Sequence, residues 1–278
     1  MIGYIILILA AVFVIWQRGS MCAGIAKIIY MRGKSDVWKK CFELAERVGG
    51  MKFDDKILHA YLVLKDGDID EANKKFALLS MDKLTDDQRL RLKSSYALVF
   101  WKRGDVATAI EMLEEVAEKA PATATYGSLG YMYAYNGNLT TALEFNLKAY
   151  EYNDSNAIII DNLAYTYYKM GEYAKAREFY EKLIEMSPTF PEAYYGYGRL
   201  LVELGEVKKG LTFVRRALTA NFSFLTMTGR EEINEYLNQF DDEELYGGDD
   251  YADSGEIYDD FENLSDETDE NTDSAQEE

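Results

Sequence analysis

Few side chains in this 278-residue sequence have the type and spacing that catalysis or metal binding needs. The single histidine, His59, falls at an inward-facing position of a predicted helix, so we interpret it as a satisfied core residue rather than a general base. Cys22 and Cys41 stand at apolar helical positions, where small core residues are expected, and they form no cluster with His59 that has metal-ligand spacing. Gly247 and Gly248 lack the strand–loop–helix context of a phosphate-binding loop. We therefore expect no enzyme activity, no cofactor and no bound metal.

Carboxylates could also do chemistry as acid–base pairs, but many of them are concentrated in one segment. Eighteen of the 49 Asp and Glu residues lie in 241–278, which contains no Lys or Arg, so residues 1–240 hold 31 acidic and 30 basic residues. A segment with this charge and no helical period is expected to be disordered and to hold no catalytic pair in place. Because neither part has a basic face, nucleic acid is not an expected partner. No small-molecule substrate is expected either.

The first sixteen residues, MIGYIILILAAVFVIW, contain no charged side chain. As a helix they would span about 24 Å at ~1.5 Å per residue, slightly less than the ~30 Å hydrocarbon core of a membrane. We expect residues 1–18 to form a transmembrane anchor, with Trp16 and Arg18 at the interface. One alternative is a signal peptide, although no basic residue precedes the apolar run. The other is a buried helix of a soluble domain, which is disfavoured because the segment is apolar on all faces.

Charge predicts the orientation of this anchor. Residues 18–40 contain six basic residues and one acidic residue, whereas nothing basic precedes the apolar run. The positive-inside rule places the basic side in the cytoplasm. We therefore expect a single-pass membrane protein whose repeat domain is cytoplasmic.

Glycines recur through the body of the chain at a nearly constant interval. They are Gly33, Gly67, Gly104, Gly137, Gly171 and Gly205, which are 34, 37, 33, 34 and 34 residues apart. Each separates two stretches with helical apolar periodicity, as at the turn of a helical hairpin. Seven residues before each glycine, and five residues after it, stands Ala or Gly, with Trp38 as the exception. Small residues at these positions let the two helices of a hairpin cross closely.

Large side chains flank these crossings. Four residues before the glycine stand Ile29, Val63, Phe100, Tyr133, Tyr167 and Leu201; nine residues after it stand Phe42, Phe76, Leu113, Asn146, Tyr180 and Val214. Asn146 is the exception in the second set, and we expect neighbouring Phe145 to compensate for it.

This order of residues resembles the tetratricopeptide family, whose 34-residue helix–turn–helix unit shows a small residue, an aromatic residue, glycine, alanine and a terminal proline. Pro121 and Pro188 stand at the repeat-ending position. The resemblance covers about 19–222 and is clearest from 90 to 222. It implies an all-α, right-handed solenoid of helix–turn–helix pairs, here preceded by a transmembrane helix and followed by a disordered acidic tail.

A solenoid needs a terminal cap to cover the apolar face of its last unit. The capping-box pattern from Thr228 to Glu231 predicts such a helix from about residue 229. The expected organisation is then a transmembrane anchor at 1–18, a degenerate first repeat at 19–52, tetratricopeptide repeats at 53–222, a C-terminal capping helix at 223–240 and a disordered acidic tail at 241–278.

The resemblance also implies a groove, lined by the first helix of each pair, in which an extended or helical peptide lies. Carried over repeat by repeat, this geometry predicts the partner-binding residues Tyr61, Leu98, Trp101, Tyr131, Tyr135, Asp161, Tyr165, Tyr168, Tyr195 and Arg199. Aromatic side chains with one polar end suit a partly wet groove. The alternative for each tyrosine is packing between repeats. The carboxylate clamp with which some family members grip chaperone C-termini is not reproduced.

We therefore expect a non-catalytic, membrane-tethered scaffold that binds a polypeptide partner in the groove of its repeats. The alternative is an accessory factor of protein translocation or envelope biogenesis that receives a client chain; in layout alone, the sequence resembles the mitochondrial outer-membrane import receptors. A third possibility is that the protein mainly regulates its own oligomerisation. The plain repeats and the absence of a basic targeting segment favour a bacterial scaffold.

Overall fold

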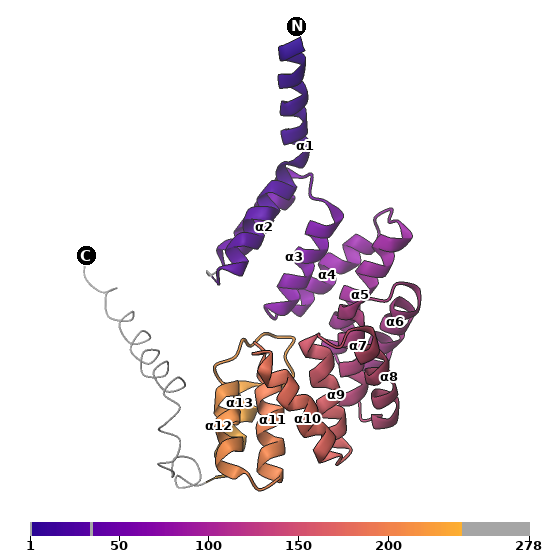
Figure 1. Ribbon diagram of the computed structural model, residues 1–278. Helices are drawn as coiled ribbons and strands as arrows, with labels where there is room; N and C mark the ends of the chain where they lie inside the picture. The colour runs from indigo at the N-terminus through magenta and orange to yellow at the C-terminus, as the bar shows by residue number, and fades with distance from the viewer. Residues whose placement is uncertain (1, 34–35, 241–278) are drawn as a thin grey trace, which may run out of the picture. The chain divides into compact units, whose positions relative to one another are not determined.

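The structure is a computed structural model that describes residues 2–33 and 36–240, with the backbone alone described for residues 2–16. The predicted acidic tail, 241–278, lies outside the described residues. The described residues are helical, with no strand, and their first twelve helices pair into six consecutive hairpins (Figure 1). These are α1 (Ile2–Met31) with α2 (Val37–Val48), α3 (Phe53–Lys65) with α4 (Ile69–Ser80), α5 (Asp86–Lys102) with α6 (Val106–Lys119), α7 (Thr123–Tyr135) with α8 (Leu139–Tyr152), α9 (Ala157–Lys169) with α10 (Tyr173–Glu185), and α11 (Pro191–Glu203) with α12 (Val207–Ala217).

Each hairpin turns on one of the repeating glycines. All six have a positive φ, between 65° and 103°, which residues with a Cβ rarely adopt. The small residues lie where the two helices cross, and the alanines among them are fully buried. Between α11 and α12, a Cβ on Gly198 would stand 2.6 Å from the carbonyl oxygen of Gly210. The predicted crossings are therefore confirmed.

Asn146 is fully buried, and its Nδ2 donates a hydrogen bond to Thr166 Oγ1 at 3.0 Å. A polar side chain that finds a buried partner can occupy such a core position. The neighbouring Phe145 packs against the rings of Tyr126 and Tyr133 and against the core on both sides, which agrees with the expectation that it compensates.

The first repeat has a core built on aromatic rings. Trp38, at the position where the other repeats have Ala or Gly, is buried edge-on to Tyr30 and Phe42, at centroid distances of 5.5 and 6.1 Å. His59 is 3% exposed, stacks on Phe42 at 4.4 Å, and places Nδ1 2.9 Å from Glu46 Oε1. The hydrogen bond to His59, followed by Lys75, lowers the pKa of Glu46 to about 2. The prediction of a satisfied core histidine is confirmed.

Helix α1 (Ile2–Met31) is continuous, so the predicted anchor and the first helix of the first repeat belong to one element. Gly19 lies against the end of α2, where a Cβ would stand 3.0 Å from Ala45 O. Among the residues whose side chains are described, no helix is long and apolar enough to cross a membrane. Because most of the predicted anchor, 1–18, lies outside that set, the anchor stays a prediction.

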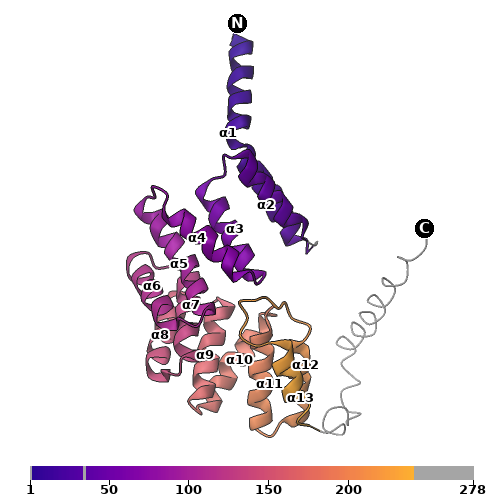
Figure 2. The same cartoon turned by 180° about the vertical axis from the view of Figure 1, so that it is seen from behind.

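The first helices of the hairpins lie on one side of the stack. Direct contacts join α3 to α5, α7 to α9 and α9 to α11, whereas no two consecutive second helices are in comparable contact within the described residues. Figure 2 shows the same succession of hairpins from behind. We call the side of α3, α5, α7, α9 and α11 that faces away from their hairpin partners the inner face.

The chain after α12 ends in a short helix. Helix α13 spans Arg230–Leu237, so it begins at the predicted start near residue 229 and ends before residue 240. Residues 221–229 are not helical, because backbone groups of this segment bond to distant repeats, as described below. The chain divides into two compact units, 1–233 and 234–278, and the site lies within the first.

The crossing of α11 and α12 generates a stability prediction. Gly198→Ala should destabilise the fold by roughly 1–3 kcal/mol, because the new Cβ meets backbone atoms that cannot move independently. Gly24→Ala is the matched control, since no atom lies within 4 Å of its Cβ position, and it should stabilise α1 by up to about 1 kcal/mol. Urea unfolding of the full-length variants measures both, and equal midpoints would contradict the close crossing.

Candidate polypeptide-binding face

Four aromatic side chains form a continuous row on the inner face. Trp101 of α5 meets Tyr131 of α7 edge-on at 5.5 Å, and Tyr131 lies 4.2 Å from Tyr135. Tyr135 then stacks on Tyr165 of α9 at 4.4 Å, with the ring planes 7° apart. All four are half-buried, so packing fixes their orientation while part of each side chain stays accessible. Such fixed rings offer contact area to a ligand at little cost in side-chain entropy.

The row leads to a cavity of about 220 Å³. Its walls come from α7, α9, α10, α11 and the start of α13. The lining residues are Tyr135, Asp161, Tyr165, Tyr168, Tyr180, Glu192, Tyr195, Gly196, Arg199, Met227, Thr228 and Glu232. For comparison, an apolar cavity of ~150 Å³ is large enough to take up benzene. This cavity therefore has room for one long side chain.

Two buried carboxyl groups stand in the cavity wall. Asp161 is 5% exposed, and burial followed by the charge of Glu192 raises its pKa well above the ordinary value. It makes no hydrogen bond through its carboxyl group to any described residue. Glu192 is 8% exposed, and burial raises its pKa as well, although backbone amides and Lys102 oppose that rise. The two acids therefore differ, because Glu192 has partners and Asp161 has none.

Tyr180 reaches the cavity from α10, behind the first helices. Its hydroxyl is buried and has no hydrogen-bond partner among the described residues. The hydroxyl lies against Gly196 of α11, where any Cβ would overlap it. Gly196 therefore leaves the space through which this ring extends to the cavity.

The segment 218–229, which we call the strap, runs from the sixth hairpin to the second and back. The amide of Phe224 donates to Lys65 O at 3.0 Å, and the amide of Met227 donates to Glu192 Oε1 at 2.7 Å. In Figures 1 and 2 the strap is the orange segment between α12 and α13 that loops toward α3. These bonds explain why the segment is not helical, since its amides are satisfied by other repeats.

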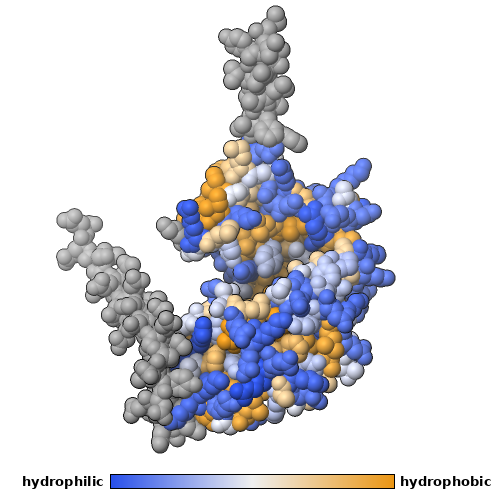
Figure 3. Space-filling model, viewed as in Figure 1, coloured by the Kyte–Doolittle hydropathy of each residue, from blue (hydrophilic) through white to orange (hydrophobic). Residues whose placement is uncertain are grey.

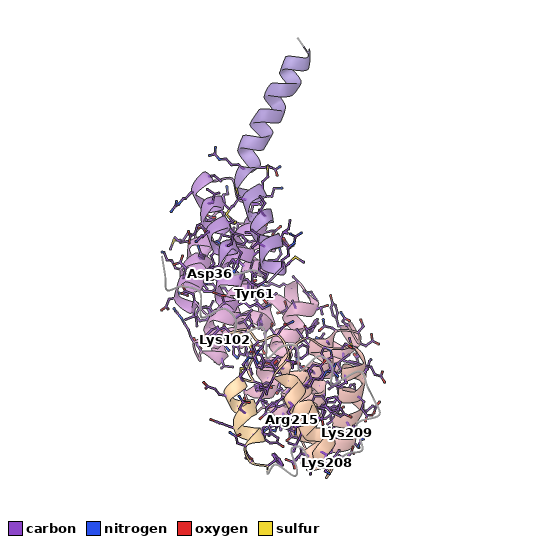
Figure 4. All side chains as sticks on the ribbon, turned by 90° about the vertical axis from the view of Figure 1, so that its left-hand side faces the viewer. Asp36, Tyr61, Lys102, Lys208, Lys209 and Arg215 are labelled. Atoms are coloured by element: carbon purple, nitrogen blue, oxygen red, sulfur yellow. The ribbon has the colours of Figure 1, made fainter. Side chains whose placement is uncertain are left out.

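Side chains hold the strap as well. Phe224 and Leu225 pack against the core of the N-terminal repeats, with Phe224 3.7 Å from the Cβ position of Gly67. Lys102 Nζ lies 3.4 Å from Thr226 O and 4.8 Å from the ring centroids of both Trp101 and Phe224. Burial lowers the pKa of Lys102, and Glu192 opposes this shift. Figure 4 shows Lys102 near Tyr61 and apart from the basic residues of α12.

The structure brings together eight of the ten residues predicted for the groove. Trp101, Tyr131, Tyr135 and Tyr165 form the row, and Asp161, Tyr168, Tyr195 and Arg199 join Tyr135 and Tyr165 around the cavity. The Arg199 guanidinium lies 5.7 Å from the ring centroid of Tyr168 and 5.4 Å from that of Tyr195. Tyr61 packs against the core of the N-terminal repeats. Leu98 packs against that core and also against the cluster that Trp101 contacts, and neither Tyr61 nor Leu98 lines the cavity. Figure 3 shows this side of the molecule hollowed below α3.

Sequence reasoning missed Glu192, Tyr180 and the strap. Glu192 follows Pro191 in the first turn of a helix, where an acid ordinarily faces solvent and balances the helix dipole. Tyr180 stands at the large apolar position of its repeat, and that pattern indicates a packing residue without a role for its hydroxyl. The available signal for the strap was Phe224 and Leu225, two large apolar residues within a segment that follows the last repeat.

Two stretches of the chain, 96–157 and 167–223, match family models described as tetratricopeptide repeat. The TPR repeat-containing protein YvcD of Bacillus subtilis (strain 168) is 27% identical over 142 residues, which are 51% of this chain and 29% of that protein. Cellulose synthase operon protein C of Pseudomonas fluorescens (strain SBW25) is 27% identical over 175 residues, 59% of this chain and 14% of that protein. The chain thus spans less than a third of the length of either curated relative.

A solved tetratricopeptide repeat protein from Parabacteroides merdae ATCC 43184 is similar in fold, with a TM-score of 0.63 at 14% identity over 79% of this chain and 83% of that one. The chain therefore contains tetratricopeptide repeats, and its described helices have the fold of a tetratricopeptide solenoid. Proteins of this fold are typically non-enzymatic scaffolds that bind protein partners.

The unpaired acid generates a prediction about pH. The folded protein keeps the Asp161 proton to a higher pH than the unfolded chain does. The free energy of unfolding therefore decreases as the pH rises above the ordinary Asp range, which means that the fold becomes less stable. Asp161→Asn removes this cost and should stabilise the fold by about 1 kcal/mol or more at high pH. Thermal unfolding at pH 5 and pH 9 measures the effect, which should be larger at pH 9. Glu178→Gln, at an exposed position of α10, is the control, and a gain for Asp161→Asn that does not grow with pH would contradict the assignment.

Proposed function

We propose that this chain is a scaffold that binds a polypeptide along its inner face. The observation that carries the proposal is the aromatic row from Trp101 to Tyr165, which is held by packing on three successive first helices. Large, oriented aromatic side chains supply much of the binding energy at protein interfaces, because they bury wide areas with few rotatable bonds. The row continues into a cavity with buried polar groups, which would add specificity.

The strap makes the proposed surface a composite one. A polypeptide that follows the row reaches Lys102 and Thr226 at one end and Met227 near the cavity at the other. The strap amides of Phe224 and Met227 are already bonded to Lys65 and Glu192. The partner would therefore bind to the first helices and the strap together, and its side chains rather than its backbone would contact this part of the face.

We also propose that the scaffold is tethered to a membrane through residues 1–18, with the repeats on the cytoplasmic side. The support is the uncharged run of sixteen residues and the basic residues that follow it. A tether of this kind raises the local concentration of whatever the inner face binds. Within this proposal the alternative role, receipt of a client chain during translocation or envelope biogenesis, differs in the partner and uses the same face.

Site-specific photocrosslinking in intact cells tests the binding face. A photoreactive phenylalanine in place of Trp101 or Tyr165 should capture a polypeptide, because both rings are accessible on the inner face. The same group in place of Leu147, an exposed residue of the second helix α8, is the matched control and should capture none. A folded cytoplasmic protein among the products supports the scaffold, whereas unfolded exported chains support the alternative role.

Affinity then quantifies the row. With the captured partner purified, Tyr165→Ala should weaken binding about tenfold or more, a typical loss for an aromatic anchor. Circular dichroism and thermal unfolding of the same variant control for folding. Efficient capture from Leu147 together with unchanged affinity of Tyr165→Ala would contradict binding on the inner face.

The tether is tested by fractionation. The full-length chain should sediment with membranes and resist extraction by carbonate, while a chain that begins at Gln17 should remain in the supernatant. That starting point keeps Arg18, whose Nε donates to Val48 O, and it keeps Gly19, which lies in α1 against the end of α2. Circular dichroism of the shortened chain shows whether the repeats still fold. Recovery of the full-length chain in the supernatant without detergent would contradict the tether.

A further inference from the structure

The cavity beside the aromatic row is lined by acidic side chains and tyrosine rings, and this combination suits one kind of ligand. Three carboxylates line it, those of Asp161, Glu192 and Glu232, together with five tyrosine rings. Glu192 is already committed, because the amide of Met227 donates to its Oε1, and this bond and the charge of Lys102 oppose the rise that burial causes in its pKa. Asp161 is as deeply buried as Glu192 but has no hydrogen bond to any described residue, so it is the acid that a ligand would meet.

A second buried polar group in the cavity wall is also unsatisfied. The Tyr180 hydroxyl is fully buried, has no partner among the described residues, and lies against Gly196. A buried polar atom without a partner costs folding free energy, typically ~1–3 kcal/mol. The Tyr180 hydroxyl and the Asp161 carboxyl group, neither of which has a hydrogen bond to a described residue, thus stand in the wall of the same cavity, where one ligand can reach both.

The chemistry of the walls excludes most ligands. An apolar side chain would leave Asp161 without a partner, and an anion would face three acidic groups against one cation, Arg199. A cation satisfies both the acid and the rings, because a nearby cation favours the ionised form of Asp161 and pairs with its carboxylate, and because tyrosine faces attract cations. The parallel rings of Tyr135 and Tyr165 offer an apolar surface along which the methylene stem of a long side chain can lie.

We propose that this cavity binds one cationic side chain, Lys or Arg, with its charged head at Asp161 and its stem along Tyr135 and Tyr165. That the side chain belongs to a polypeptide rests on the proposed function above. The Arg199 guanidinium lies over Tyr168 and Tyr195, which places this cation beside two other rings of the cavity. The cavity would thus select the partner by one basic residue at a fixed place, while the aromatic row contributes affinity.

Calorimetric titration of the full-length chain in a non-ionic detergent tests the proposal with single-residue probes. The cationic probes are N-acetyl-lysine methylamide and N-acetyl-arginine methylamide, and N-acetyl-norleucine methylamide is the neutral probe of similar length. We expect saturable binding of at least one cationic probe and at least tenfold weaker binding of the neutral probe. Asp161→Asn should weaken the cationic probe at least tenfold, whereas Glu178→Gln, which removes an exposed carboxylate of α10, should leave its affinity unchanged.

Three results would overturn the proposal: no saturable binding of either cationic probe, equal binding of the neutral probe, or equal affinity of wild type and Asp161→Asn. Thermal unfolding shows whether the variant is folded, as expected from the removal of a buried carboxyl group that has no hydrogen bond to any described residue. Because the probes are single residues, the result does not depend on a partner. Probe binding through Asp161 without any crosslinked polypeptide would support the cavity and count against the scaffold, and a polypeptide on the inner face without probe binding would do the reverse.

Discussion

Within each hairpin a small residue of the first helix crosses a small residue of the second, or Trp38 in the first repeat, and the positions of all other groups depend on this contact. At α11 and α12 both residues are glycine, and their backbones approach so closely that no Cβ fits. In α9 and α10 the residues are fully buried alanines. The crossing fixes each first helix against its partner. Equivalent positions of successive first helices therefore lie side by side on the inner face. The aromatic row from Trp101 to Tyr165 follows from this regularity, since its members recur on successive first helices.

The strap adds a contact that the repeats alone do not contain. It joins the second hairpin to the sixth through Lys65 and Glu192, and it buries Phe224 against the N-terminal core. Glu192, an acid in the first turn of α11, thereby accepts a hydrogen bond from the strap. Lys102 lies between the rings of Trp101 and Phe224. What remains in the cavity is an acid, Asp161, whose carboxyl group makes no hydrogen bond to any described residue. Glu192 therefore has a structural role, because it bonds to the strap, whereas the proposed binding role falls to Asp161, which has no such bond.

The sequence was sufficient for the regular part of this structure and insufficient for the contacts between distant repeats. The glycine spacing and the small residues predicted every hairpin, because both are local requirements of a turn and a crossing. The aromatic positions of the inner face followed from the same register. Glu192 and Tyr180 could not be recognised, since their roles depend on a segment more than 30 residues away and on the missing side chain of Gly196. The strap could not be recognised for the same reason, because amide bonds to Lys65 and Glu192 are not visible in a local pattern.

The proposed use of the inner face is tested most directly by a structure of the full-length chain bound to its captured partner. We expect the partner to lie along Trp101, Tyr131, Tyr135 and Tyr165, with a Lys or Arg side chain in the cavity beside Asp161 and with the strap still bonded to Lys65 and Glu192. A partner bound to the second helices, with the aromatic row left open to solvent, would contradict the proposal.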